Sequence, residues 1–283
     1  MTTTGKTIQI FCPHGEPRGV RIAEMTTRIV QAVVSPRSQL DLALQRAELR
    51  GVGVYFLFGQ AEETSRPLVY IGEAEDCAER IKQHNQQKEF WNTSIAIVSR
   101  TQSFTKAHVR MLEWLSIKKT VEAKRFELDN GNEGSEPRVP EAMAADVYEV
   151  FETVDVLLST LGFPIFEPLV NESRSNSQVR FYCNRGGAKA SGLYTEEGFV
   201  VEKGSTARSE LLGSARDAIR ELRDGMIRDG TLVKNNGELR FSRDHVFSSP
   251  STAASVVVGG SSNGWREWKD DKSRTLHDVY RAS

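Results

Sequence analysis

Two short apolar runs, at residues 52–58 and 68–71, constrain this chain most, because each contains β-branched or aromatic residues and a tyrosine, with a glycine inside the first run and directly after the second. A polar stretch at 60–67 lies between them. Runs of this length and composition, bounded by turn residues, are typical of β-strands. The pattern therefore predicts a β-hairpin with a long connection, in which Gly-Val-Tyr opens one strand and Tyr-Ile-Gly closes the other.

Polar residues able to bind a phosphate or a cation follow this hairpin. Arg80 and His84 are four residues apart, so they share one face of a helix that Asp76 can cap. Glu113 borders the apolar face of a longer helix that follows Thr105. A carboxylate in that position is costly to bury without a cation. Together with the two tyrosines, these residue types can hydrolyse a phosphodiester around one divalent metal ion.

Each of these residues also has a purely structural interpretation. Tyr55 and Tyr70 suit half-buried strand positions on β-propensity alone. Arg80 and His84 could belong to a solvated helix face, and Glu113 could pair with a cationic neighbour on its own helix. The functional interpretation is favoured because the two tyrosines are followed, within a short stretch of the chain, by an arginine, a histidine and a glutamate that suit the same chemistry.

The order and spacing of these residues resemble the GIY-YIG nuclease family, which is named for the two tripeptides. The resemblance covers residues 51–132 approximately. It implies a small antiparallel sheet flanked by helices and a metal-dependent endonuclease that hydrolyses phosphodiester bonds, with DNA as the favoured substrate. The catalytic set that it implies is Tyr55, Tyr70, Arg80, His84, Glu113 and Asn130.

The resemblance also implies a role for each side chain. Tyr55 would be the general base that activates water, and Tyr70 would help to position the water or the phosphate. Arg80 would bind a phosphate oxygen through its planar guanidinium group. His84 would assist as a base or as a proton donor to the leaving oxygen. Glu113 would hold a single Mg²⁺ or Mn²⁺ ion.

Two positions leave alternatives open. The family asparagine corresponds to Asn130 or Asn132, of which Asn130 is favoured, and an Asn-Gly pair is also an ordinary turn signal. Many relatives carry a basic residue directly after the second tripeptide, where this chain has Glu73. Either Lys82 or Lys106 supplies the missing positive charge, or the site is slower or narrower in its substrates.

The net charge of −1 provides no overall basic field, so nucleic acid would be bound through local patches. Residues 100–125 form one such patch beside the predicted site, although basic helix faces also serve solubility. The predicted nucleic-acid contacts are Lys82, Lys106, Arg110, Lys118, Arg266 and Lys269.

The fold class predicted from these patterns is α+β, with a β-rich N-terminal arm, a GIY-YIG-like sheet with flanking helices and a separate α+β C-terminal domain. Within the arm, Ser35-Pro36 predicts the start of a helix. Polar stretches at 129–140 and 171–178 mark boundaries. The expected regions are a β-rich region with a helix at 1–50, the nuclease domain at 51–135, a helical connector at 136–175 and the C-terminal domain at 176–283.

Residues 180–280 resemble an uncharacterised domain that often follows GIY-YIG or restriction-type modules, and this resemblance implies no chemistry. Ser249-Pro250 predicts a short helix there. Trp265 and Trp268 stand beside Arg266 and Lys269 and could stack on bases, although two such tryptophans more often close a small core. A homodimer or a partner protein bound through this domain is a further expectation.

Several classes of protein do not fit the sequence. Cys12, Cys77 and Cys183 are far apart and show no paired spacing, so neither a zinc site nor a disulfide framework is indicated. There is no secretory leader and no apolar run of about 18 residues, so a cytoplasmic protein without membrane contact is expected. The alternatives to an endonuclease are a catalytically weak nucleic-acid-binding regulator that keeps the nuclease fold, and a structural partner in a larger repair or defence assembly.

Overall fold

The computed structural model describes residues 5–61, 67–132, 134–169, 179–235 and 237–282. The chain divides into two compact units, Met1–Pro168 and Leu169–Ser283. The regions expected at 1–50 and 51–135, and most of the connector expected at 136–175, fall within the first unit. In the described residues no helix is long and apolar enough to cross a membrane. The segment at 171–178, expected to be a boundary, lies outside the described residues.

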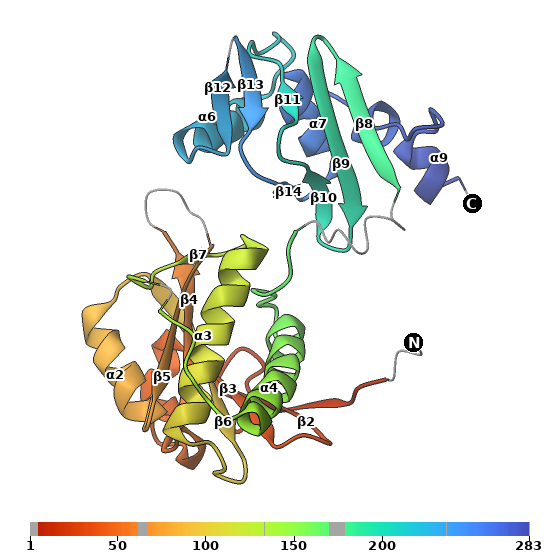
Figure 1. Cartoon of the computed structure of the whole chain (residues 1–283). Coiled ribbons are helices and arrows are strands. Elements are labelled where there is room, and N and C mark those ends of the chain that lie inside the picture. Colours follow the sequence, from red (N-terminus) through yellow and green to blue (C-terminus); the bar gives the residue numbers. More distant parts are fainter. Residues whose placement is uncertain (1–4, 62–66, 133, 170–178, 236, 283) are drawn as a thin grey trace. The chain divides into compact units, whose positions relative to one another are not determined.

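The first unit is built on a seven-stranded sheet of order β1-β2-β3-β6-β4-β5-β7 (Figure 1). Neighbouring strands are antiparallel except for β5 and β7, which are parallel. The predicted hairpin is therefore present as β4 and β5. The strands are β1 (Ile8–Phe11), β2 (Arg21–Met25), β3 (Val30–Pro36), β4 (Gly53–Gln60), β5 (Pro67–Ala74), β6 (Trp91–Ser99) and β7 (Glu127–Leu128).

Helices cover both faces of this sheet, and β4 shows how the sequence sorts its side chains between them. Successive strand residues point to opposite faces. Val54 and Phe56 therefore join the core shared with α3 (Lys106–Ala123) and α4 (Glu141–Thr160), which lie next to each other (Figure 1). Tyr55 and Leu57 join the core on the other face, under α2 (Cys77–Gln87). Tyr55 and helix α2 thus lie on the same side of the sheet.

Local signals set the starts of the two helices that carry predicted site residues. The Asp76 carboxylate accepts a hydrogen bond of 3.0 Å from the Glu79 backbone N–H, so Asp76 caps α2 as the sequence predicts. Thr105 caps α3 through a capping box in which His108 takes the place of the usual glutamate or glutamine.

The helix predicted to start at Ser35-Pro36 is wrong. Both residues end strand β3, because its pairing with β6 continues as far as Pro36 opposite Thr93. This long-range ladder overrides the local capping signal. The chain then turns through three short pieces, η1 (Arg37–Gln39), α1 (Leu40–Ala43) and η2 (Ala47–Leu49).

The second unit contains a four-stranded sheet of order β14-β10-β9-β8 and a three-stranded sheet of order β11-β13-β12. The predicted helix after Ser249-Pro250 is present, since the Ser249 hydroxyl accepts from the Thr252 N–H and caps α7. The α+β fold class is confirmed. The elements of this unit are β8 (Arg180–Arg185), β9 (Ala188–Thr195), β10 (Gly198–Val201), β11 (Thr206–Ala207), α6 (Asp217–Arg228), β12 (Leu232–Asn235), β13 (Glu238–Phe241), β14 (His245–Phe247), α7 (Pro250–Val258), α8 (Gly264–Glu267) and α9 (Leu276–Tyr280).

Both tryptophans considered for base stacking belong to the packing of this unit. Trp268 is fully buried, lies against Phe199 with ring centroids 4.3 Å apart, and donates its indole N–H to the Pro250 carbonyl oxygen. Trp265 is half-buried, and the guanidinium of Arg281 lies 3.4 Å from its ring centroid. The base-stacking interpretation of Trp268 is therefore wrong, because its ring has no exposed face.

Candidate active site

Tyr55, Tyr70 and His84 converge on the face of the sheet under α2. A hydrogen bond of 2.9 Å joins the Tyr55 hydroxyl to Nε2 of His84. The Tyr70 ring centroid lies 6.1 Å from that of Tyr55 and 4.8 Å from that of His84. The strand pair positions both tyrosines, because Tyr55 lies opposite Gly72 and Leu57 opposite Tyr70 in the β4–β5 register.

At positions 53 and 72, the glycines of the two tripeptides, there is no room for a side chain. A Cβ atom at Gly72 would lie 2.4 Å from the Tyr55 hydroxyl oxygen, a distance too short for any side chain. A Cβ atom at Gly53 would lie 2.5 Å from the Ile97 carbonyl oxygen, which belongs to the paired strand β6. Glycine at 72 thus provides the space that the Tyr55 hydroxyl occupies next to His84.

Burial sets the protonation of this pair. It raises the pKa of Tyr55 above its usual value, Tyr70 adds to this increase, and the positive charge of Arg80 opposes it. Burial, with the positive charges of Arg80 and Lys88, lowers the pKa of His84 to about 4. His84 is consequently a neutral imidazole at neutral pH. Its Nδ1 atom is buried and has no hydrogen-bond partner among the described residues.

Two cations border the tyrosines and the histidine. Arg80 is exposed and donates to the Gln83 side-chain oxygen at 2.9 Å. The ammonium group of Lys88 lies 4.4 Å from the centroid of the Tyr70 ring and forms an ion pair with Asp129. Lys88 was not among the predicted site residues. The signal that could have found it is its spacing of one further helical turn after Arg80 and His84.

Asn130 and Glu113 line the outer edge of β5. The backbone N–H of Ile71 donates to Oδ1 of Asn130 at 3.1 Å, and Nδ2 of Asn130 donates to the Ile71 carbonyl oxygen at 2.8 Å. Two residues further on, the Glu73 N–H donates to Oε1 of Glu113 at 3.1 Å. These two side chains thus continue the edge pairing that β7 provides at Leu68 and Val69. Asn132, the other candidate, is exposed.

A second carboxylate lies next to Glu113. Burial raises the pKa of Glu113, and the charge of Glu73 raises it further. Lys106 lies 3.4 Å from Oε1 of Glu73 and 3.3 Å from Oε1 of Glu75, so it is the lysine placed beside the unexpected acid. Oε2 of Glu73 is buried and has no hydrogen-bond partner among the described residues. The local charge balance favours a further cation.

These residues fit a divalent metal of the magnesium type. Within the described part of the chain, no three His, Cys, Asp or Glu side chains group into a metal cage. Mg²⁺ does not require such a cage, because it commonly binds one or two carboxylates and keeps several waters. Glu113, with the partnerless oxygen of Glu73 beside it, provides that kind of donor set.

The predicted nucleic-acid contacts are distributed unevenly. Lys106 and Arg110 share the α3 face of Glu113, and both of their charges lower the pKa of that carboxyl group. The ammonium group of Lys118 lies 4.9 Å from the centroid of the Trp114 ring. Lys82 is exposed on α2. In the second unit, Arg266 and Lys269 are both exposed.

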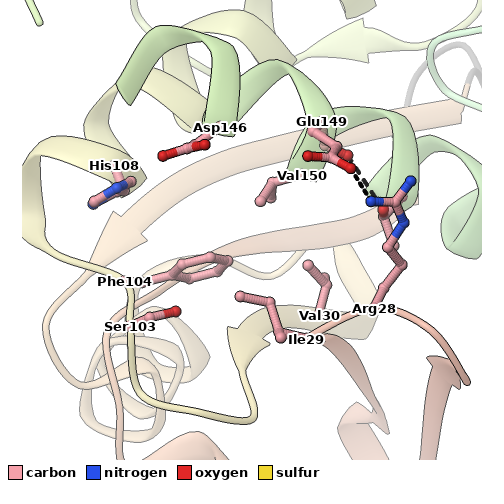
Figure 2. A pocket seen from close by; sticks show the side chains of 10 residues that line it. Arg28, Ile29, Val30, Ser103, Phe104, His108, Asp146, Glu149 and Val150 are labelled. Carbon is pink, nitrogen blue, oxygen red and sulfur yellow. Dashed lines mark hydrogen bonds and ion pairs between the residues drawn. The ribbon is translucent and has the colours of Figure 1, made fainter. Parts of the chain in front are cut away.

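A separate cavity of about 340 Å³ lies between the start of β3, the start of α3 and helix α4 (Figure 2). Ile29, Phe104 and Val150 form its apolar part, and Arg28 forms an ion pair with Glu149 at its rim. None of the ten lining residues belongs to the predicted catalytic set. The predicted catalytic residues around β5 therefore lie apart from this cavity.

Comparison with known families identifies the domain in which these residues lie. Residues 52–130 match the model of the GIY-YIG catalytic domain, and residues 181–280 match that of a domain of unknown function, DUF4357. The chain therefore contains a GIY-YIG domain of the nuclease type followed by a DUF4357 domain, as predicted. No curated protein matched the chain, and no solved structure did.

Proposed function

We propose that this protein is a divalent-metal-dependent endonuclease that hydrolyses phosphodiester bonds in DNA. The observation that carries the proposal is the wrapping of one site around the open edge of β5. Tyr55 of β4, Tyr70 of β5 and His84 of α2 meet on one face of the sheet, and Glu113 and Asn130 bond to the outer edge of β5. A nuclease-type domain with this set can activate water and counter phosphate charge at one place.

Tyr55 and His84 act as a proton relay in this proposal. The high pKa of Tyr55 prevents the phenol from ionising alone at neutral pH. His84 is neutral, and its Nε2 lies 2.9 Å from the Tyr55 oxygen, so it is placed to take the phenolic proton. The low pKa of His84 opposes this transfer in the free protein, and a bound phosphate, whose negative charge offsets the charges of Arg80 and Lys88, would raise that pKa and favour it. Tyr55 can then remove a proton from the attacking water. The relay thus keeps the general-base role of Tyr55 compatible with its burial.

Arg80, Tyr70 and Lys88 bind the phosphate in this proposal. Arg80 is exposed and Tyr70 is half-buried, whereas Tyr55 is fully buried, so a phosphate group meets the first two residues before the third. Arg80 contributes a planar pair of N–H donors, and Lys88 contributes a compact charge beside Tyr70. Asn130 positions the edge of β5 through its two bonds to Ile71.

Glu113 would hold Mg²⁺ or Mn²⁺ in this proposal. The bound ion would polarise a phosphate oxygen as a Lewis acid and counter the charge that develops on the leaving oxygen. Glu113 itself accepts a hydrogen bond from the Glu73 N–H, which holds its carboxylate at the outer edge of β5, the strand that also carries Tyr70. Lys106 and Arg110 on the same helix face add positive potential for the DNA backbone.

Plasmid nicking with Mg²⁺ or Mn²⁺ tests this function. Glu113→Gln keeps the size and the hydrogen bond to the Glu73 N–H but removes the charge, so it should abolish metal-dependent cleavage while the protein stays folded. Glu122→Gln is the matched control, because Glu122 lies on the same helix, is exposed and pairs with Lys119. Undiminished cleavage by Glu113→Gln would reject the assignment of the metal residue.

The same assay separates the enzyme from its alternatives. A wild-type protein that binds plasmid but does not nick it with either metal would be the nucleic-acid-binding regulator. A protein that does neither would be a structural partner. Labelled DNA and RNA duplexes of one sequence, cleaved side by side, test the choice of DNA.

A further inference from the structure

Resting on the function proposed above, we propose that Glu73 is a second carboxylate ligand of the cation held by Glu113. The residue that directly follows the second tripeptide would then bind metal in this chain. The site would be a two-carboxylate site whose two oxygen donors come from strand β5 and helix α3.

Backbone geometry keeps the two acids together. The Glu73 N–H donates to Oε1 of Glu113 at 3.1 Å, so the Glu73 residue is itself the anchor of the proposed metal carboxylate. Glu73 is a residue of strand β5, and Glu113 lies within an 18-residue helix, so both backbones are rigid. Both carboxylates are therefore carried by regular elements of the fold, as a metal site requires of its ligands.

Lys106 pairs with only one of the two carboxylate oxygens of Glu73. Its ammonium group lies 3.4 Å from Oε1, and the Lys106 side chain is 51% exposed while that of Glu73 is 18% exposed. The other oxygen, Oε2, is buried without a partner among the described residues. A buried carboxylate oxygen that makes no hydrogen bond is costly, so a ligand that coordinates it gains that free energy back.

Glu75 provides a comparison for Glu73, because it pairs with the same lysine but is exposed to solvent. It lies two residues further along the chain and contacts the same Lys106 at 3.3 Å, but its side chain is 70% exposed. Solvent satisfies such a carboxylate. Glu73 and Glu75 therefore share one cationic partner and differ in burial and in their relation to Glu113. This difference makes Glu75 the matched control for Glu73.

The test measures Mn²⁺ affinity directly, by titration calorimetry or by the electron paramagnetic resonance signal of free Mn²⁺, with no nucleic acid present. The proteins are the full chain as wild type, Glu73→Gln, Glu75→Gln and Glu113→Gln. Removing a residue that only orients a metal ligand typically weakens metal binding by about 10- to 100-fold, so losing a direct ligand should cost at least about tenfold. Glu75→Gln should stay within about twofold of wild type.

The outcomes separate this inference from the function on which it rests. Equal Mn²⁺ affinities for Glu73→Gln and Glu75→Gln would overturn the role of Glu73, while a loss of binding in Glu113→Gln would still support the metal site. Unchanged affinity in Glu113→Gln would instead reject the metal site itself. Circular dichroism spectra and unfolding midpoints without metal show that each variant is folded. Added Mn²⁺ should then raise the midpoint of Glu73→Gln less than that of wild type.

Discussion

Buried aromatic side chains serve different ends in the two units. In the first unit the hydroxyl of the fully buried Tyr55 faces the imidazole of His84, a group that can change its protonation. In the second unit the indole N–H of the fully buried Trp268 faces the Pro250 carbonyl oxygen, which cannot. Both rings are equally hidden, so burial alone does not separate a site from a core.

The partner of the polar atom makes the distinction. A phenol bonded to a neutral imidazole can pass a proton, whereas an indole bonded to a backbone carbonyl can only be held in place. Buried atoms without a partner do not make the distinction. Oε2 of Glu73 and Nδ1 of His84 lie at the GIY-YIG site, but the Ser116 hydroxyl and one guanidinium nitrogen of Arg223 are also buried without a partner among the described residues, and neither belongs to the proposed site.

The largest effect is expected from Tyr55→Phe, which removes a hydroxyl and nothing else. Loss of a general base typically lowers turnover by about 10²- to 10⁴-fold, and we expect a decrease in that range with little change in DNA affinity. Single-turnover cleavage and DNA binding should be measured together. The control is Tyr148→Phe, since Tyr148 is 48% exposed on α4. Equal rates for the two variants would show that the Tyr55 hydroxyl is structural.

The opposite behaviour is expected from Trp268→Ala. Truncating a buried Trp typically costs about 3–5 kcal/mol of stability, so the second unit should unfold at a clearly lower temperature. Trp265→Ala should cost less, because Trp265 is only half-buried. Differential scanning calorimetry of the full chain measures both. A Trp268→Ala protein with unchanged unfolding but weakened DNA binding would break the distinction drawn between the two units.

Part of the candidate site could be predicted from the sequence, but the contacts between its elements could not. Strand pairing places Tyr55 and Tyr70 on neighbouring strands, and helical spacing places Arg80 and His84 on one face, whereas the grouping of Glu113 with them followed from the family resemblance. The pairing of Lys106 with Glu73 depends on how α3 packs against β5, which no local pattern encodes. The sequence marks Glu73 only as an acid in the place of a base.

Ser35 illustrates the same limit for secondary structure. Serine before proline is a good local signal for the start of a helix. Residue 35 nevertheless stays in strand β3, because Ser94 of the distant strand β6 lies opposite it and the ladder extends to Pro36. A helix cap, worth about 1 kcal/mol, yields here to the pairing of a central strand.

An intermediate effect is expected from pH, through His84. Its pKa is about 4 in the folded protein, against the usual value near 6.5. Above pH 6.5 both the folded and the unfolded states are neutral at this residue, so it contributes nothing. Between pH 6.5 and 4 the unfolded state binds a proton that the folded state does not, so stability falls as the pH falls. The decrease should approach about 3 kcal/mol at pH 4, since each pKa unit corresponds to about 1.4 kcal/mol.

The measurement is the free energy of unfolding of wild type and His84→Gln at several pH values from 7.5 to about 4.5. Glutamine does not titrate, so the variant should lose less stability than wild type as the pH falls through 6.5. Carboxylates titrate alike in both proteins, and the difference between the two curves isolates His84. Parallel curves would mean that His84 is protonated as readily in the folded state as in the unfolded state.

The smallest effect is expected from the exposed cations of the second unit. If Arg266 and Lys269 bind DNA phosphates, replacing both with glutamine should weaken binding and reduce the salt dependence of the affinity by about one unit of slope for each phosphate that is no longer neutralised. The control is Lys203→Gln, since Lys203 is exposed in the same unit. An unchanged slope would place DNA binding in the first unit alone and favour a protein partner for the second.

The hydrogen bonds that fix Asn130 and Glu113 also hinder aggregation through the edge of the sheet. A strand edge with free N–H and C=O groups is a template on which another chain can add a strand and aggregate. Past Val69 the outer edge of β5 has no paired strand among the described residues, and Asn130 and Glu113 occupy the groups of Ile71 and Glu73 that another chain would need. The residues proposed to serve cleavage therefore also block self-association. Variants that remove both side chains should be tested for aggregation before a loss of activity is interpreted.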